Sequence, residues 1–210
     1  MSYQIAIHQH GDTSVFTKEP LSIKQPNAHQ VVIEHQAIGL NFIDVYHRQG
    51  LYPLTMPAVI GQEAAGVITE IGEAVQGFKV GDRVAYAGYF GAYATHNIVD
   101  THRLIQLPEN VSYEQAAASL LKGGTASYLL HDTFEVKHSH IVLIHAGAGG
   151  VGQILIKWAK KLGATVITTV GSAEKMPIVT ALGADLVINY SKGDLVQTIK
   201  QHFPKGVDVV

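Results

Sequence analysis

The sequence contains no cysteine, which excludes disulfide bonds and every metal site that depends on thiolate ligands. It has no long run of charges of one sign and a formal net charge of only −2, so no surface for nucleic acid or membrane lipid is indicated. No uninterrupted apolar run is long enough to span a bilayer. Residues 1–4 have neither the basic nor the apolar region of a signal peptide. Together these absences predict a cytoplasmic protein.

Histidine is frequent, with 12 residues scattered along the chain. The pairs His8 with His10 and His138 with His140 have a spacing that places both rings on one face of a strand. Neither pair has the neighbouring carboxylates that would support a metal site. We interpret them as surface residues and expect no bound metal.

Short β-like segments, separated by glycine and proline, extend from residue 1 to about residue 107. The predicted strands lie at residues 4–8, 31–34, 65–68, 83–86 and 93–96. Many short strands with frequent turns are typical of a barrel-like or sandwich-like β domain.

A predicted helix then connects this part to the remainder of the chain. Ser112 and Gln115 have the spacing of a capping box in front of an alanine-rich segment. The sequence predicts an interruption at Gly123 and Gly124, and a second helical segment over residues 125–134.

From residue 141 onward the pattern alternates between strand and helix. The predicted strands are 141–145, 165–170, 185–189 and 207–210, and the predicted helices are 150–162, 173–182 and 193–202. Such alternation indicates a doubly wound parallel sheet, so the fold class is α/β with a preceding β domain. A complete dinucleotide fold has six strands. We therefore expect this chain to be the N-terminal part of a longer protein, poorly active and weak in cofactor binding alone.

Between the first of these strands and its helix lies a glycine motif, Gly147-x-Gly149-x-x-Gly152. The first glycine permits a tight turn, the second lets the backbone approach a pyrophosphate, and the third allows close packing of helix on strand. The N-terminus of the helix offers unpaired N–H groups to the phosphates. The motif in this setting predicts a dinucleotide site rather than an empty turn.

The end of the second strand indicates which dinucleotide binds. NAD enzymes usually carry an acid at this strand end, whereas this sequence has Gly171 and Ser172 followed by Lys175. A hydroxyl and an ammonium group suit a 2′-phosphate. Glu174 argues the other way, but it can point to solvent and stabilise the helix N-terminus. We predict NADP rather than NAD.

Three stretches carry a resemblance to a known family: residues 39–46 with 50–53, residues 61–67, and residues 146–152. Together they resemble the zeta-crystallin-like quinone oxidoreductases of the medium-chain dehydrogenase/reductase superfamily, and the likeness extends over nearly all of the chain. Lys157 departs from the family pattern, which usually has Gln there. Because it lies away from the pyrophosphate turn, we expect little effect.

The resemblance implies a GroES-like catalytic domain at residues 1–122, completed by a returning C-terminal segment, and a partial NADP-binding Rossmann domain at residues 123–210. It also implies a cofactor cleft between the domains, a homodimer, and NADPH-dependent reduction of a quinone. In the zinc-dependent branch of the superfamily, a cysteine replaces Asn41 and a histidine replaces Gln62. Without those ligands a zinc mechanism is not expected. A quinone needs no Lewis acid, since its conjugation stabilises the charge that hydride delivery creates.

The candidate site residues follow from the motifs and the resemblance. Asn41, Tyr46 and Tyr52 are the candidates for positioning substrate or nicotinamide. For Asn41 the alternative is a turn that caps the next helix, and for the tyrosines it is an ordinary amphipathic surface position. The cofactor-binding candidates are Asn41, Phe42, Ile43, Asp44, Val45, Tyr46, Thr125, Tyr128, Gly147, Gly149, Gly150, Val151, Gly152, Gly171, Ser172, Lys175 and Tyr190. Glu63 is assigned a structural role only.

Two other functions stay open. One is NADPH-dependent reduction of activated C=C bonds, as in enones or alkenals. The other is a non-catalytic, crystallin-like or RNA-binding NADPH protein, although the chain has no basic stripe for RNA.

Overall fold

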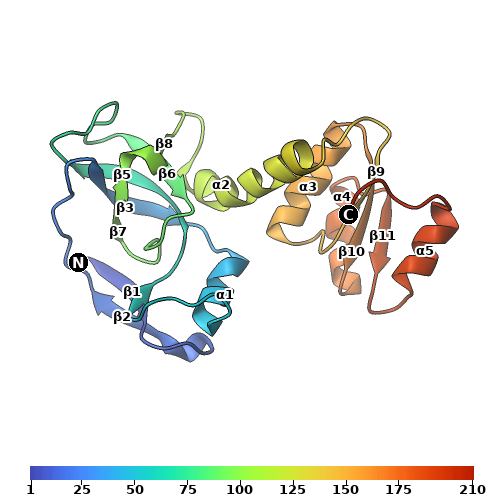
Figure 1. The fold of residues 1–210 in the computed structure, drawn as a ribbon, viewed down its shortest axis with the longest axis horizontal. Coiled ribbons are helices and arrows are strands. Elements are labelled where there is room, and N and C mark those ends of the chain that lie inside the picture. The colour runs from blue at the N-terminus through green and yellow to red at the C-terminus, as the bar shows by residue number, and fades with distance from the viewer. The chain divides into compact units, whose positions relative to one another are not determined.

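The computed structural model describes all of residues 1–210. It divides into two compact units, an N-terminal unit of residues Met1–Leu121 and a C-terminal unit of residues Lys122–Val210 (Figure 1). No helix is long and apolar enough to cross a membrane.

The N-terminal unit is built from two antiparallel sheets. One has five strands in the order β7-β3-β5-β6-β8, and the other has three in the order β2-β1-β4. The strands are β1 (Tyr3–Ile7), β2 (Phe16–Pro20), β3 (Gln30–Ile38), β4 (Ala58–Val59), β5 (Glu63–Ile71), β6 (Arg83–Ala87), β7 (His96–Asp100) and β8 (Ile105–Gln106). Two short 3-10 helices, η1 (Thr13–Val15) and η2 (Thr101–Arg103), lie between strands. The larger sheet holds the core, in which Ile33, Ile68 and Tyr86 are fully buried.

The β-rich pattern predicted for this unit is confirmed at β1, β3, β5 and β6. The strand predicted at residues 93–96 is wrong, because the observed strand β7 begins at His96. The preceding residues include two bends, at Tyr93 and Thr95, and pair with β1 instead, through a bridge between Gln4 and Ala94. The Thr95 N–H accordingly donates to the Tyr3 carbonyl, a non-local contact that composition does not report.

Helix α1 (Phe42–Gln49) follows β3 and carries several candidate residues. It begins at Asn41, whose backbone N–H donates to the Asp44 carboxylate at 3.0 Å as part of a capping box. It ends at Gly50, which has a left-handed backbone (φ 82°). Asp44 and His47 form its buried face.

Helix α2 (Tyr113–Tyr128) is continuous through Gly123 and Gly124, so the predicted interruption is wrong. The predicted capping box is confirmed: the Ser112 N–H donates to Gln115 Oε1 at 2.9 Å, and the Gln115 N–H donates to Ser112 Oγ at 3.1 Å. Two glycines disfavour a helix by only about 1 kcal/mol each, and the burial of Ala116, Ala117 and Ala126 on the same helix offsets this cost. One π-helical turn, η3 (Leu129–Thr133), follows.

The C-terminal unit has a parallel sheet in the order β11-β10-β9, as predicted. Its elements are β9 (Ile141–Ile144), α3 (Gly150–Lys161), β10 (Thr165–Val170), η4 (Ala173–Lys175), α4 (Met176–Ala181), β11 (Leu186–Asn189) and α5 (Leu195–His202). The fourth predicted strand is reduced to one parallel bridge, Val142 with Val209. Thus β9 has β10 on one side and only a short segment on the other.

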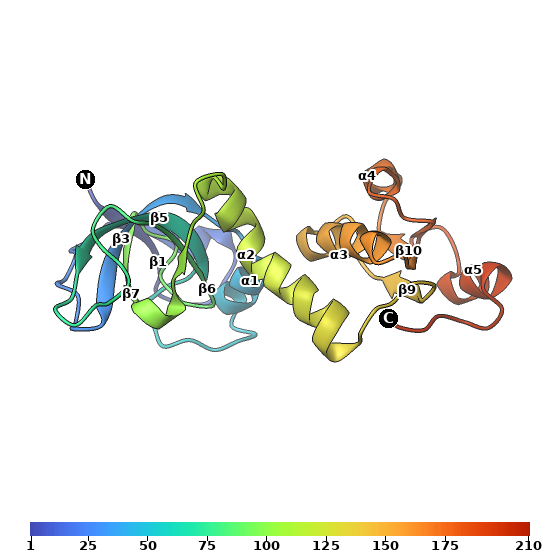
Figure 2. The same ribbon diagram turned by 90° about the horizontal axis from the view of Figure 1, so that it is seen from above.

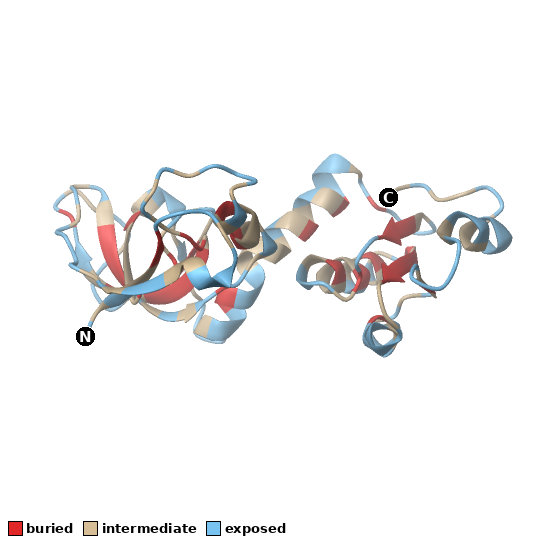
Figure 3. Ribbon diagram, turned by 90° about the horizontal axis from the view of Figure 1, so that it is seen from below, coloured by how far each residue is buried: buried red, intermediate tan, exposed pale blue.

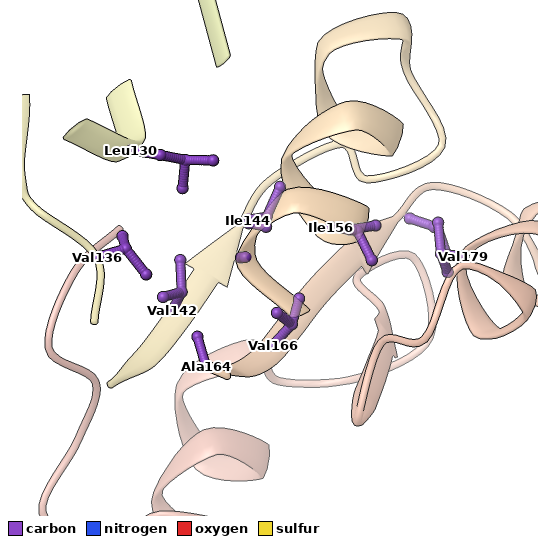
Figure 4. Packing of buried hydrophobic residues seen from close by; sticks show 10 residues of the cluster. Leu130, Val136, Val142, Ile144, Ile156, Ala164, Val166 and Val179 are labelled. Atoms are coloured by element: carbon purple, nitrogen blue, oxygen red, sulfur yellow. The ribbon is translucent and has the colours of Figure 1, made fainter. Parts of the chain in front are cut away.

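The helices cover both faces of this sheet (Figure 2). On one face, Ile156 of α3 and Val179 of α4 pack with Val142 and Val166 of the strands (Figure 4). On the other face, residues of α5 pack against Leu143 and neighbouring strand residues. Both faces of the strands are therefore buried (Figure 3), which explains their apolar, non-alternating sequences.

Candidate functional site

The glycine motif forms the turn between β9 and α3, in the strand–turn–helix setting that the sequence predicts. A Cβ atom added at Gly147 would lie 2.0 Å from Thr168 Oγ1 of the neighbouring strand. One added at Gly152 would lie 2.6 Å from the Ala146 carbonyl oxygen. Neither position has room for a side chain, so these glycines permit the close approach of turn, helix and strand.

The N-terminus of α3 is open to an anion. Its N-cap, Gly149, supplies no side-chain cap, and no acidic residue lies in the first turn. Gly149 and Gly150 are exposed, and the next residue, Val151, is partly exposed. The first N–H groups of a helix have no partner within it, and the helix dipole makes this end positive. This turn has the geometry and the charge to hold a pyrophosphate.

A second group of candidates lies at the ends of β10 and β11, which form the carboxyl edge of the same sheet. Tyr190 folds over Gly171, because a Cβ added at Gly171 would lie 2.6 Å from Tyr190 Oη. Ser191 Oγ donates a hydrogen bond of 2.7 Å to the Gly171 carbonyl. Ser172 and Lys175 follow directly, Ser172 as the N-cap of η4 and Lys175 within it. The structure therefore brings Gly171, Ser172 and Tyr190 together, with exposed Lys175 one short turn away.

Glu174 is exposed, as predicted from the sequence. A hydrogen bond from Ser172 lowers the pKa of its carboxyl group, so this group stays ionised close to Ser172.

Two residues of this edge were not among the candidates. His145 comes directly after β9, and its Nδ1 lies 3.2 Å from Thr169 Oγ1. Thr169 Oγ1 also accepts from the Ala146 N–H at 3.2 Å, which ties the glycine turn to β10. The signal for His145 was its position between the apolar run and the motif. Thr169, one residue before the end of β10, gave no separate signal.

Thr125 and Tyr128 lie in the last turns of α2. Tyr128 is about half exposed (49%).

In the N-terminal unit, α1 and the loop after it present a chain of aromatic rings. Phe42 and Tyr46 are in edge contact with centroids 5.1 Å apart, and Tyr46 and Tyr52 are in edge contact at 5.6 Å. Phe42 is 69% exposed and Tyr52 48%. Ile43 and Val45 are partly buried on the same helix. The three rings could pack against a flat ligand.

Asn41 and Asp44 are held by buried polar contacts. Asn41 Nδ2 donates to Glu63 Oε2 at 2.8 Å. Asp44 Oδ2 accepts from Tyr93 Oη at 3.0 Å, in addition to its bond from the Asn41 backbone. Burial, followed by the neighbouring Asp44 charge, raises the pKa of Tyr93 far above its usual value. The Asp44 carboxylate is thus buried and points into the unit.

No group of three or more histidine, aspartate or glutamate side chains is placed to hold a metal ion. His8 pairs with Glu19 at the surface, and His140 accepts a hydrogen bond from the Lys137 N–H.

Comparison with known proteins identifies both units. The family described as "Alcohol dehydrogenase GroES-like domain" matches residues 27–109, and the family described as "Zinc-binding dehydrogenase" matches residues 150–210. The chain is 46% identical over 203 residues to a quinone oxidoreductase of Salmonella typhimurium, covering 96% of this chain and 62% of that protein. It is 42% identical over 212 residues to a 2-haloacrylate reductase of a Burkholderia species, covering 97% and 64%.

Among solved structures, the Escherichia coli quinone oxidoreductase complexed with NADPH superimposes with a TM-score of 0.94 at 43% identity, covering 96% of this chain and 63% of that one. The chain therefore spans a little under two thirds of the length of these relatives.

Proposed function

Because this chain belongs to the family of the quinone oxidoreductases, we propose that it binds NADPH and serves the NADPH-dependent reduction of quinones without a metal ion. The observation that carries the proposal is the carboxyl edge of the C-terminal sheet. There the open glycine turn at the start of α3 lies on the same edge as the Gly171, Ser172 and Tyr190 group.

The residues of the C-terminal unit fit the adenosine half of NADPH. Gly147, Gly149 and Gly152 leave a turn without side chains for the pyrophosphate, and the helix dipole favours its charge. Lys175 offers an ammonium group to the 2′-phosphate, and Ser172 offers a hydroxyl that would exchange its hydrogen bond to Glu174 for one to the phosphate, with Tyr190 beside them. The absence of an acid in residues 168–172 supports NADP over NAD.

We assign the positioning of nicotinamide and substrate to the N-terminal unit. Asn41 offers an amide, and Phe42, Tyr46 and Tyr52 offer ring faces and hydroxyl groups. When bound, NADPH supplies the hydride, and the protein supplies orientation and a surface with little water. Thr125 and Tyr128 stay assigned to the cofactor on the resemblance alone.

The proposal of a metal-free reaction rests on residue chemistry. Asn41 and Gln62 stand where the zinc-dependent branch has cysteine and histidine, and the chain has no cysteine elsewhere. Neutral amides are poor ligands for zinc. A quinone also stabilises the charge created by hydride delivery without a Lewis acid.

For the whole protein we further propose a catalytic domain over residues 1–122, an NADP-binding domain over residues 123–210 and a homodimer. We also assign the protein to the cytoplasm. These proposals follow the resemblance.

Cofactor choice is tested by titrating the chain with NADPH and NADH and following nucleotide fluorescence. We expect NADPH to bind more tightly. Replacement of Lys175 by alanine should weaken NADPH binding about tenfold, the effect of one charged hydrogen bond, and leave NADH unchanged. Lys157→Ala, an exposed lysine on α3, is the matched control. Equal affinities for the two nucleotides in the wild type, or no effect of K175A, would contradict the assignment.

The second candidate is reduction of activated C=C bonds, which the similarity to a 2-haloacrylate reductase favours. Oxidation of NADPH by the full-length protein, measured with 1,4-benzoquinone, with an enone and with no acceptor, separates the functions. Faster turnover of the enone favours the second candidate. No turnover with either acceptor favours a non-catalytic NADPH-binding protein.

A further inference from the structure

Glu63, the first residue of β5, is an acidic side chain with no exposed surface. Both of its carboxylate oxygens accept hydrogen bonds from the same unit. Oε2 accepts from Asn41 Nδ2 at 2.8 Å, and Oε1 accepts from the Leu121 N–H of α2 at 2.7 Å. Each oxygen of this buried carboxyl group therefore has a hydrogen-bond donor, as a buried polar group requires.

The backbone around Glu63 is shaped to admit this carboxylate. A Cβ atom added at Gly39 would lie 2.3 Å from Glu63 Oε2 and 2.2 Å from the carbonyl oxygen of Ala117 in α2. Only glycine at position 39 lets the end of β3, the carboxylate and the helix meet at this point.

These contacts restrict what Asn41 can present to a ligand. Because Asn41 donates through Nδ2 to Glu63 Oε2, its NH₂ group faces Glu63. The capping box with Asp44 holds the backbone of Asn41 at the start of α1. One Nδ2 hydrogen is used by Glu63, and an amide NH₂ group carries a second one. Asn41 therefore presents an N–H donor, which suits a carbonyl oxygen of nicotinamide or of a quinone.

We propose that Glu63 is a positioning residue, which fixes the Asn41 amide as a hydrogen-bond donor toward the nicotinamide or the substrate carbonyl. This extends the structural role expected for Glu63, and it rests on the proposed function. The same carboxylate joins the start of α1 to Leu121, so the orientation of Asn41 depends on α2 as well as on its own helix. Glutamine at position 63 would bring its own NH₂ group to Asn41 and force the asparagine amide to turn over.

The test compares two nucleotides that share the adenosine half. NADPH carries nicotinamide, whereas 2′,5′-ADP does not. We expect E63Q to weaken NADPH binding about tenfold, the effect of one lost hydrogen bond to a charged network, and to leave 2′,5′-ADP binding unchanged. N41A should do the same. In the N41A background, E63Q should add nothing, because Glu63 acts through Asn41. Glu70→Gln, on the exposed part of β5, is the control.

The outcomes separate this inference from the proposed function. If the wild type binds neither nucleotide, the proposed function itself fails. If the wild type binds both equally, or if E63Q weakens both equally or adds its effect to N41A, the positioning role is overturned. Should E63Q not fold, as judged by circular dichroism, an NMR measurement on the wild type decides. With ¹⁵N-labelled asparagine, the Asn41 side-chain NH₂ resonance must shift with NADP⁺ and not with 2′,5′-ADP, and an unchanged resonance overturns the proposal.

Discussion

His35 forms part of a partly buried hydrogen-bond chain in the N-terminal unit. Because the Ala94 carbonyl can only accept, His35 Nδ1 carries the proton and donates to it at 2.7 Å. His35 Nε2 then accepts from Tyr86 Oη at 3.0 Å, and Tyr86 Oη accepts from Asn97 Nδ2 at 3.0 Å. Protonation would turn Nε2 into a donor, and the Tyr86 hydroxyl hydrogen would lose its acceptor. The neutral imidazole is therefore built into the fold.

The size of the effect follows from the pKa. Burial lowers the pKa of His35 from 6.5 to about 4, a change that the hydrogen bond to Ala94 only partly opposes and that the nearby His96 increases slightly. Between these two values the unfolded chain binds more protons than the folded chain, so stability rises with pH. The contribution is complete above pH 6.5 and is lost as the pH falls toward 4. At pH 5 the loss amounts to about 2 kcal/mol.

Replacement of His35 by glutamine tests this, because glutamine can still donate and accept but does not titrate. Urea unfolding of both proteins would be followed at pH 7.5 and pH 5 by tyrosine circular dichroism. The single tryptophan, Trp158, lies in the other unit and reports on that unit instead. The wild type should lose about 2 kcal/mol more than H35Q between the two pH values. Equal losses, to within about 0.5 kcal/mol, would refute the reasoning.

Two predictions concern the C-terminal unit. Asp185 accepts hydrogen bonds from Lys160 Nζ at 2.7 Å and from the Val166 N–H at 2.7 Å. Because the pair is partly exposed, D185N should lower the free energy of unfolding by only about 1 kcal/mol. An unchanged urea midpoint, measured by Trp158 fluorescence, would contradict this. In G152A the new Cβ would meet the Ala146 carbonyl. We therefore expect the free energy of unfolding to fall by about 2 kcal/mol or more and NADPH binding to be lost. Gly193→Ala, where nothing lies within 4 Å, should change neither property, and similar behaviour of the two variants would show that close packing is not the cause.

Local sequence was sufficient for much of the C-terminal unit. The strand predicted at residues 165–170 is β10, and the helix predicted at residues 150–162 is α3, which is followed by Gly163 with a φ of 84°. In the N-terminal unit, the capping box of Ser112 and Gln115 also formed as predicted. In each case the signal and the structure lie within a few residues of each other, so periodicity, capping and turn chemistry decide the outcome.

The candidate site was predicted only in part. The glycine motif lies between β9 and α3 as expected, since its residues are contiguous. The contact of Tyr190 with Gly171 depends on the parallel pairing of β10 with β11, which brings residues distant in sequence together. Helix α2 continues through two glycines because other residues of the helix are buried, which the local sequence does not report.

The sequence by itself therefore determined the alternating β and α elements, the dinucleotide turn and the absence of the zinc ligands, because each of these depends on residue type and short spacing. The tertiary structure alone decided how the Asn41 amide is held. Glu63 is separated from Asn41 by 22 positions and from Leu121 by 58. Only the packing of α2 against the N-terminal sheet brings these three groups to one buried carboxylate.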